Sequence, residues 1–236
     1  MKVLMFSGSP KREESVGNKF LNMIKDCLHE CDSEIEVDIY IGSECNIIET
    51  DGSGNEFVTG KTLYNDDMLF LEKKFLESDF IILSSPVYAH QVSSYMKKLI
   101  DRLAYWLHLY RLAGKFGYII SISSNNGNEF VNKYLRSMME YWGLLVVGES
   151  SIETTKINSD QILESYARFV CKKILSVETE SVIDVPVTQE QTFEIQKENY
   201  LKRESGFERD FWKQQGYFEM ESFEELFRRK LREKNE

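Results

Sequence analysis

The chain has few residues of the kinds that build metal centres. Its 236 residues include only four cysteines and three histidines. The cysteines are scattered, and none forms the CxxC pair that zinc and iron–sulfur sites commonly use. Cys27 and Cys31 lie four residues apart on an apolar helical pattern, which is typical of small buried hydrophobes. We therefore expect no metal ligands, and neither a structural zinc nor an iron–sulfur cluster.

Long apolar runs and an excess of basic residues are also missing. No apolar run approaches the roughly 20 residues that a bilayer-spanning helix needs. Met1 and Lys2 lead directly into a strand-like run, without the pattern of a signal peptide. The formal net charge of −10 would repel nucleic acid and anionic membranes over most of the surface. These features predict a cytoplasmic protein with neither a nucleic-acid nor a membrane partner.

Short apolar runs, separated by segments of helical length, mark the expected strands. Four of them lie at 3–6, 80–83, 118–122 and 144–147. Because these runs do not alternate with polar residues, they are typical of strands buried on both faces of a parallel sheet. A fifth run, 34–40, alternates apolar residues with acids, which indicates an edge strand with one solvated face.

Helical periodicity fills the segments between these runs. Apolar residues recur at helical spacing over 16–31, 92–110, 128–142 and 160–176, and a further helix is expected near 66–77. A strand followed by a helix, repeated along the chain, predicts an α/β protein with a doubly wound parallel sheet.

Two segments do not fit this alternation. Residues 41–65 form a long glycine-containing loop, and loops of that length in compact domains are often functional. The segment from about 186 onward is highly charged but carries many aromatic residues, too many for a solvated disordered tail. We expect this segment to form helices that dock either on the core or on a second subunit.

The turn after the first expected strand, "SGSPKREESVGN" (7–18), has the composition of an anion site. Ser7, Ser9, Ser15 and Asn18 offer side-chain donors, and the free amides of the following helix start point to the same place. The phosphate-binding signatures GxxxxGK[ST] and GxGxxG are absent, which argues against a P-loop or a dinucleotide-type grip. The alternative for this turn alone is an ordinary capped strand-to-helix connection.

A second constellation, "SSPVYAHQVSSYMKKLIDR" (84–102), follows the third expected strand. Pro86 ends that strand at its carboxyl edge, where open α/β sheets bind ligands. Val87 and Tyr88 could then present backbone groups and an aromatic face to a flat ring. The alternative is that Tyr88 only covers the core.

Together, "GSPKREESVGN" (8–18), "DDM" (66–68) and "SPVYAHQVSSYMKKLIDR" (85–102) resemble the NADPH-dependent FMN reductase family. They look closest to its branch of iron–sulfur flavoproteins and their cluster-free relatives. The resemblance covers residues 1 to about 176 and implies a flavodoxin-like fold, with five parallel strands in the order 2-1-3-4-5.

The resemblance also implies a division of the chain. A flavodoxin-like FMN-binding domain would span 1–178, and an aromatic-rich helical C-terminal extension would span 186–236.

Three loops would hold FMN if the family pattern applies. The loop for the FMN phosphate comprises Ser9, Lys11, Ser15, Gly17 and Asn18. The segment against the isoalloxazine comprises Pro86, Val87, Tyr88, Ala89 and His90. The third loop comprises Ser123, Ser124, Asn125 and Gly127. His90 either faces the substrate side of the flavin or is a surface histidine, and no catalytic side chain is implied because the flavin carries the chemistry.

The chain departs from the family pattern at two places that concern the cofactors. The iron–sulfur branch has a compact cysteine motif before "DDM", whereas 41–65 holds only Cys45 here, too few thiolates for a cluster. The third loop is usually glycine-rich in the family, but "SSNNGN" (123–128) has a single glycine.

The function that the resemblance implies is an FMN-dependent NAD(P)H oxidoreductase. Electrons would pass from reduced nicotinamide through bound FMN to a small-molecule electron acceptor such as a quinone, a flavin or another electrophile. The family also implies a homodimer or homotetramer. Two alternatives remain: a flavodoxin-type electron carrier, and a non-catalytic flavodoxin-like binding module.

Overall fold

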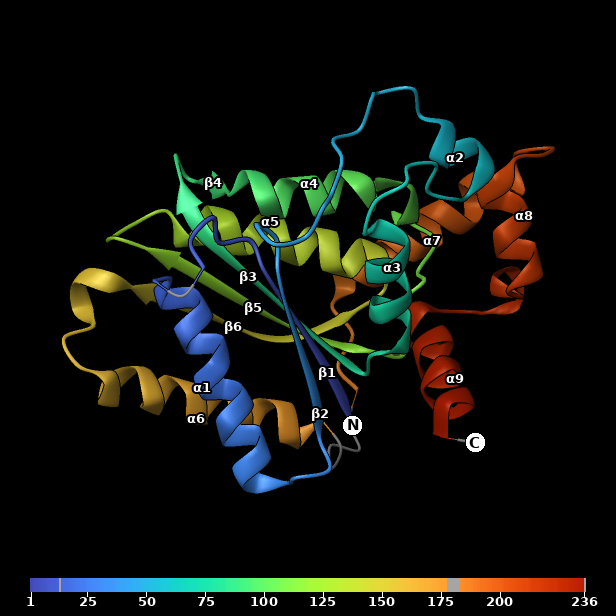
Figure 1. Cartoon of the computed structure of the whole chain (residues 1–236). Helices are drawn as coiled ribbons and strands as arrows, with labels where there is room; N and C mark the ends of the chain where they lie inside the picture. The colour runs from blue at the N-terminus through green and yellow to red at the C-terminus, as the bar shows by residue number, and fades with distance from the viewer. Residues whose placement is uncertain (13, 178–182, 236) are drawn as a thin grey trace.

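The computed structural model describes residues 1–12, 14–177 and 183–235. In these residues, the central sheet is built from five parallel strands (Figure 1). The strands are β1 (Lys2–Ser7), β2 (Glu36–Ile41), β3 (Phe80–Tyr88), β5 (Phe116–Ser123) and β6 (Leu145–Glu153). Their order, β2-β1-β3-β5-β6, is the predicted flavodoxin-like order 2-1-3-4-5. A two-residue strand that the sequence did not predict, β4 (Gln91–Val92), pairs antiparallel with the end of β3.

Burial along the strands follows their place in the sheet. Residues 80–85 of β3 are all buried, because helices cover both faces of this central strand. In β2 the acids Glu36 and Asp38 are exposed, which confirms the predicted edge strand.

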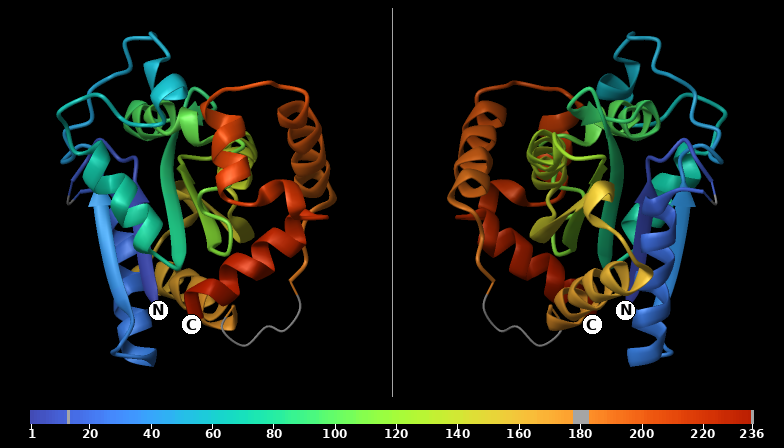
Figure 2. Two further views of the ribbon diagram at one scale, coloured as in Figure 1. Left: turned by 90° about the vertical axis from the view of Figure 1, so that its right-hand side faces the viewer. Right: turned by 90° about the vertical axis from the view of Figure 1, so that its left-hand side faces the viewer.

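Helices cover the two faces of the sheet in unequal layers (Figures 1 and 2). One face packs against α1 (Val16–Cys31) and α6 (Asp160–Ser176). The other packs against α3 (Met68–Glu77), α4 (Ser94–Arg102) and α5 (Asn128–Trp142). The predicted helices 16–31, 128–142 and 160–176 are therefore confirmed.

The predicted single helix over 92–110 is wrong. Helix α4 ends at Arg102 and is followed by a short 3₁₀ helix, η1 (Ala104–Trp106). His108 and Tyr110 then have φ values of 64° and 47°, which no α-helix tolerates. Trp106 and Tyr110 are nonetheless fully buried, so an irregular segment produced the apolar spacing of a helix.

The long loop over 41–65 contains one short helix, α2 (Asn55–Thr59), that the sequence did not reveal. Gly54 and Gly60 flank it with φ values of 70° and 68°, a conformation that favours glycine. A side chain at Gly60 would also collide with the ring of Phe207, so this loop and the C-terminal segment are in contact.

The C-terminal segment is helical, as predicted. It consists of α7 (Val187–Leu201), α8 (Phe207–Gln214), the 3₁₀ helix η3 (Tyr217–Glu219) and α9 (Phe223–Asn235), which lie along one side of the sheet (Figure 2). Phe193, Trp212 and Phe223 are fully buried in a cluster that includes Tyr110 and Leu145 of the same chain. A second subunit is therefore not needed to bury these rings, and of the two expected docking places the structure shows the core of the same chain.

The division of the chain into two domains stays a prediction. The cluster just described joins the C-terminal helices to residues of the sheet and of the segment before β5. The predicted boundary at 178 lies outside the described residues.

Three of the four cysteines lie close together in the structure, which the scattered positions in the sequence did not predict. Cys27 and Cys171 are buried, but Cys31 is exposed rather than a buried hydrophobe. The sulfur atoms of these three residues lie within 4.8 Å of one another. In the described residues, no helix is long and apolar enough to cross a membrane.

Candidate functional site

A cavity of about 220 Å³ opens at the carboxyl edge of the sheet, where the loops after β1, β3 and β5 meet. Nine of the residues predicted to hold FMN line it: Ser9, Lys11, Ser15, Gly17, Pro86, Val87, Tyr88, Ser123 and Ser124. A larger cavity of about 460 Å³ lies beside Lys115, just before β5 begins, and therefore at the opposite edge of the sheet. Parallel sheets bind ligands at the carboxyl edge, so the smaller cavity is the candidate site.

The start of α1 supplies anion donors to this cavity. Ser15 caps the helix, and its Oγ accepts a hydrogen bond from the Asn18 amide at 3.3 Å. The amides of Val16 and Gly17, in the first turn, have no acceptor within the helix, and both residues line the cavity. Ser9 Oγ accepts from the Lys11 amide at 3.2 Å, which leaves its own proton available to a ligand. Two hydroxyls, helix amides and a lysine form a donor set that fits a phosphate.

The Asn18 side chain holds the loop after β1 through hydrogen bonds to other residues of that loop. Its Oδ1 accepts from Ser7 Oγ at 2.5 Å, and its Nδ2 donates to the carbonyls of Lys11 (2.9 Å) and Arg12 (2.8 Å). The side chain is buried and committed to the loop, so the structure does not place Asn18 on the cavity. We assign it the role of a positioning residue.

Close packing, and not only a tight turn, requires glycine at position 8. A Cβ at this position would lie 2.7 Å from both Met96 Cβ and Ser93 Oγ. Its amide donates to Ser84 O at 2.7 Å, and its carbonyl accepts from Ser93 Oγ. The absence of a side chain lets the first loop pack against the start of α4, which joins the first and second loops.

The second loop is a tight β-hairpin between β3 and β4. Tyr88 pairs with Gln91, and the two residues between them, Ala89 and His90, have φ values of 49° and 62°. This is the geometry of a hairpin turn that usually holds asparagine or glycine. Tyr88 is 49% exposed and lines the cavity, so it does not serve only to cover the core.

The turn of this hairpin points away from the cavity. The His90 ring stacks on the Phe130 ring of α5, with centroids 5.1 Å apart and planes 10° apart. His90 is exposed and, like Ala89, does not line the cavity. Of the two alternatives for His90, the structure favours the surface histidine.

The third loop contributes two of its predicted residues. Ser123 and Ser124 line the cavity, and Ser124 O accepts from the amide (3.2 Å) and the hydroxyl (2.8 Å) of Thr155. Asn125 and Gly127 do not line it. Gly127 begins α5 with φ 85°, and a Cβ there would lie 2.7 Å from the His90 ring.

Six cavity residues were not among those predicted to hold FMN, although Ser7 was named as a donor of the anion site: Ser7, Glu14, Val16, Ser84, Ile122 and Thr154. Most belong to the quoted motifs or to strand ends next to them. Thr154 follows β6 directly. Ligands bind at the carboxyl ends of parallel strands, and this rule predicts Thr154 when it is applied to β6 as well as to β1, β3 and β5. Glu14 is exposed, so solvent screens its charge.

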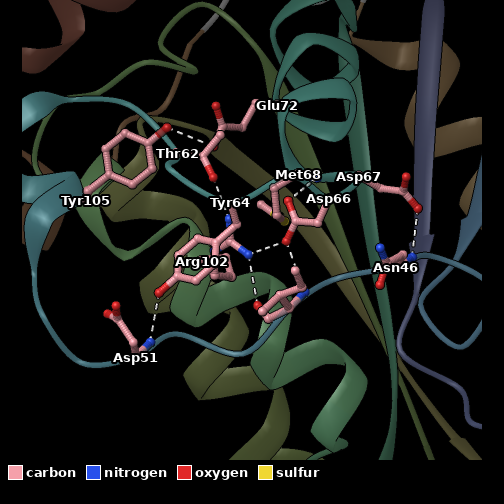
Figure 3. Close-up of polar contacts among 11 residues, drawn as sticks. Asn46, Asp51, Thr62, Tyr64, Asp66, Asp67, Met68, Glu72, Arg102 and Tyr105 are labelled. Atoms are coloured by element: carbon pink, nitrogen blue, oxygen red, sulfur yellow. Dashed lines mark hydrogen bonds and ion pairs between the residues drawn. The ribbon is translucent and has the colours of Figure 1, made fainter.

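The 41–65 loop is fixed by a buried ion pair, shown in Figure 3. The side chains of Arg102 and Asp66 are 1% and 0% exposed and bind each other. The Arg102 guanidinium also donates to Ile48 O at 2.8 Å and to Thr62 Oγ1, and it lies 4.1 Å from the Tyr64 ring centroid. The motifs "DDM" and "KKLIDR" therefore meet in space and order the loop next to α4.

Burial raises the pKa values of two groups near this loop, Glu72 and Cys45. Burial raises the pKa of Glu72, whose Oε1 accepts from the Tyr105 hydroxyl at 2.7 Å (Figure 3). Burial, together with the carboxylates of Asp67 and Glu44, raises the pKa of Cys45 to about 11. At neutral pH Cys45 is therefore a protonated thiol.

The strand order and the position of the cavity define a flavodoxin-like α/β protein with a ligand site at the carboxyl edge. The profile of the family described as NADPH-dependent FMN reductase matches residues 1–157, and the chain belongs to this family. The recognition of this family from the sequence motifs is thus confirmed.

Two relatives and two solved structures show the range of similarity. An iron–sulfur flavoprotein of Archaeoglobus fulgidus is 33% identical over 149 residues, covering 63% of this chain and 66% of that protein. An iron–sulfur flavoprotein of Methanocaldococcus jannaschii is 31% identical over 153 residues, covering 64% and 77%. The chain thus spans just under two thirds of the length of the Archaeoglobus protein.

The solved structures share the fold at low identity. A flavone reductase has a TM-score of 0.58 and 13% identity, covering 75% of this chain and 64% of that chain. An apo NADH:FMN oxidoreductase has a TM-score of 0.56 and 18% identity, covering 80% and 93%.

Proposed function

We propose that the protein is an NAD(P)H oxidoreductase that passes electrons through bound FMN to a small acceptor such as a quinone or a flavin. The observation that carries this proposal is the cavity at the carboxyl edge, which joins an anion-binding end to a partly exposed aromatic end. Bound FMN would supply the hydride and electron transfer, and the protein would supply orientation.

The chain's own residues have distinct tasks in this proposal. Ser9, Ser15, Lys11 and the first-turn amides of α1 would bind the phosphate. Pro86 to Tyr88 and the third loop would bound the flat part of the ligand. Tyr88 at this end of the cavity is 49% exposed. We therefore expect one face of a bound ring to stay open to a second substrate.

The proposal predicts a colour change on reduction. Purified protein, reconstituted with FMN if necessary, is mixed with NADPH without air while the flavin absorbance is recorded. We expect rapid bleaching, followed by recovery of the colour when a quinone is added. Colour that NADPH does not bleach would indicate an electron carrier, and failure to bind added FMN would indicate a non-catalytic binding module.

Replacing Ser9 with alanine is expected to weaken FMN binding by about ten- to a hundredfold, because a lost hydrogen bond to a charged group costs roughly 1.5–3 kcal/mol. The measurement is a fluorescence titration of apoprotein with FMN. Ser137→Ala is the matched control, because its hydroxyl bonds only within α5, to Lys133 O at 3.1 Å. Equal affinities for Ser9→Ala and Ser137→Ala would place the phosphate elsewhere.

The remaining parts of the proposal concern the setting of the enzyme. A homodimer or homotetramer, a cytoplasmic location and the absence of nucleic-acid or membrane partners are carried over from the sequence. Light scattering of the purified protein tests the assembly.

A further inference from the structure

Three of the four cysteines meet where α1 packs against α6, two helices that lie side by side beneath the sheet in Figure 1. Cys27 and Cys31 are one turn apart on α1, and Cys171 reaches them from α6. All three sulfur atoms lie within 4.8 Å of one another, with Cys31 Sγ 4.0 Å from Cys171 Sγ. Three sulfurs bound to one zinc ion at about 2.3 Å each would be about 4 Å apart.

We propose that Cys27, Cys31 and Cys171 form a three-thiolate site for a thiophilic metal ion, with Zn²⁺ as the ion that the site takes. Thiolates are the ligands that zinc and other soft ions prefer over magnesium or calcium. The site lies near the C-terminal end of α1, roughly 20 Å along the helix from the phosphate loop at its start. It is therefore separate from the proposed flavin site and does not depend on the proposed function.

Exposure within the cluster argues for a ligand rather than for packing alone. Cysteines that serve only as small hydrophobes are typically buried, as Cys27 and Cys171 are. Cys31 is exposed, yet its sulfur approaches the sulfur of Cys171. An exposed third ligand gives a metal ion a route from solvent to the two buried sulfurs.

Groups beside the cluster can complete the coordination of the zinc ion. A cavity of about 210 Å³ next to Cys27 is lined by the carboxylates of Asp26, Glu30 and Glu164. Water or one of these carboxylates can fill the fourth position of a tetrahedral zinc ion. Binding releases one proton from each thiol, and the resulting complex of three thiolates with Zn²⁺ carries one negative charge. Arg168 lines the same cavity and lies 3.6 Å from Glu30, with which it forms an exposed ion pair.

The test is zinc binding by the full chain with its FMN, kept reduced with a phosphine. Zinc content is measured by elemental analysis after dialysis, and affinity by competition with a chromophoric chelator. We expect one zinc per chain. Cys31→Ser and Cys171→Ser should each lower the affinity more than about tenfold, because even the loss of a residue that only supports a ligand costs that much.

Cys45→Ser is the matched control, since Cys45 lies in the 41–65 loop and outside the cluster. It should keep the affinity of the unchanged chain, and FMN content should be the same in all variants. Because Cys31 is exposed, its replacement leaves the core intact, and thermal unfolding checks this. The proposal is overturned if the unchanged chain binds no more zinc than Cys31→Ser, or if Cys45→Ser loses as much affinity as the cluster variants.

Discussion

Replacing Arg102 with methionine is expected to lower the free energy of unfolding by about 3–5 kcal/mol, because it leaves a buried carboxylate without its partner. Asp66 has no exposed side-chain surface, so water cannot replace the guanidinium. Its remaining partners are the amides of Met68 (3.1 Å) and Ile48 (3.0 Å), which do not neutralise its charge. The loss also releases Ile48 O and Thr62 from the guanidinium, so the 41–65 loop should become sensitive to proteases.

Urea unfolding measures the change, and two further variants make it specific. Arg136→Met removes partly exposed ion pairs with Glu149 (2.9 Å) and Glu140 (3.9 Å), and such pairs contribute under about 1 kcal/mol each. Adding Asp66→Asn to Arg102→Met removes the buried charge and should restore part of the stability. The explanation fails if Arg136→Met is equally damaging, or if the double variant is no more stable than Arg102→Met.

This network shows what the sequence could and could not predict. The motifs around Asp66 and Arg102 identified the family, but the two residues are 36 positions apart, and nothing in the sequence indicated that their side chains bind each other. The strand order and the longest helices were predictable because burial on two faces leaves clear apolar patterns. The helix over 92–110 was not, because the backbone at His108 and Tyr110 is set by packing rather than by local spacing.

The candidate site also contains residues that the sequence could predict and residues that it could not. Nine of the residues that line the cavity were predictable because parallel strands bring their carboxyl ends to one edge. Asn18 and His90 do not line the cavity, because side-chain direction depends on particular partners, the loop carbonyls for Asn18 and the Phe130 ring for His90. The cysteine cluster could not be seen because 140 residues separate Cys31 from Cys171.

Replacing Trp212 with alanine is expected to destabilise the protein by about 3–5 kcal/mol, the usual cost of truncating a buried large aromatic residue. Trp212 is fully buried, and its Nε1 donates to His108 O at 2.8 Å. Its ring lies 5.1 Å from the Phe193 centroid and 5.2 Å from that of Tyr200. One substitution therefore removes the centre of the cluster that holds α7, α8 and α9 on the sheet.

Equilibrium unfolding and limited proteolysis report this loss, with Phe169→Ala as the matched control. Phe169 is 51% exposed on α6, so its truncation should change stability little. A loss of stability in Trp212→Ala no larger than that in Phe169→Ala would show that the cluster does not hold the C-terminal segment on the sheet.

The dependence of the unfolding midpoint on protein concentration then tests where the C-terminal segment docks. Docking within one chain makes the unfolding midpoint independent of concentration, whereas docking across a homodimer would raise the midpoint as the concentration rises. Because the buried rings contact Tyr110 and Leu145 of the same chain, we expect the midpoint to stay constant.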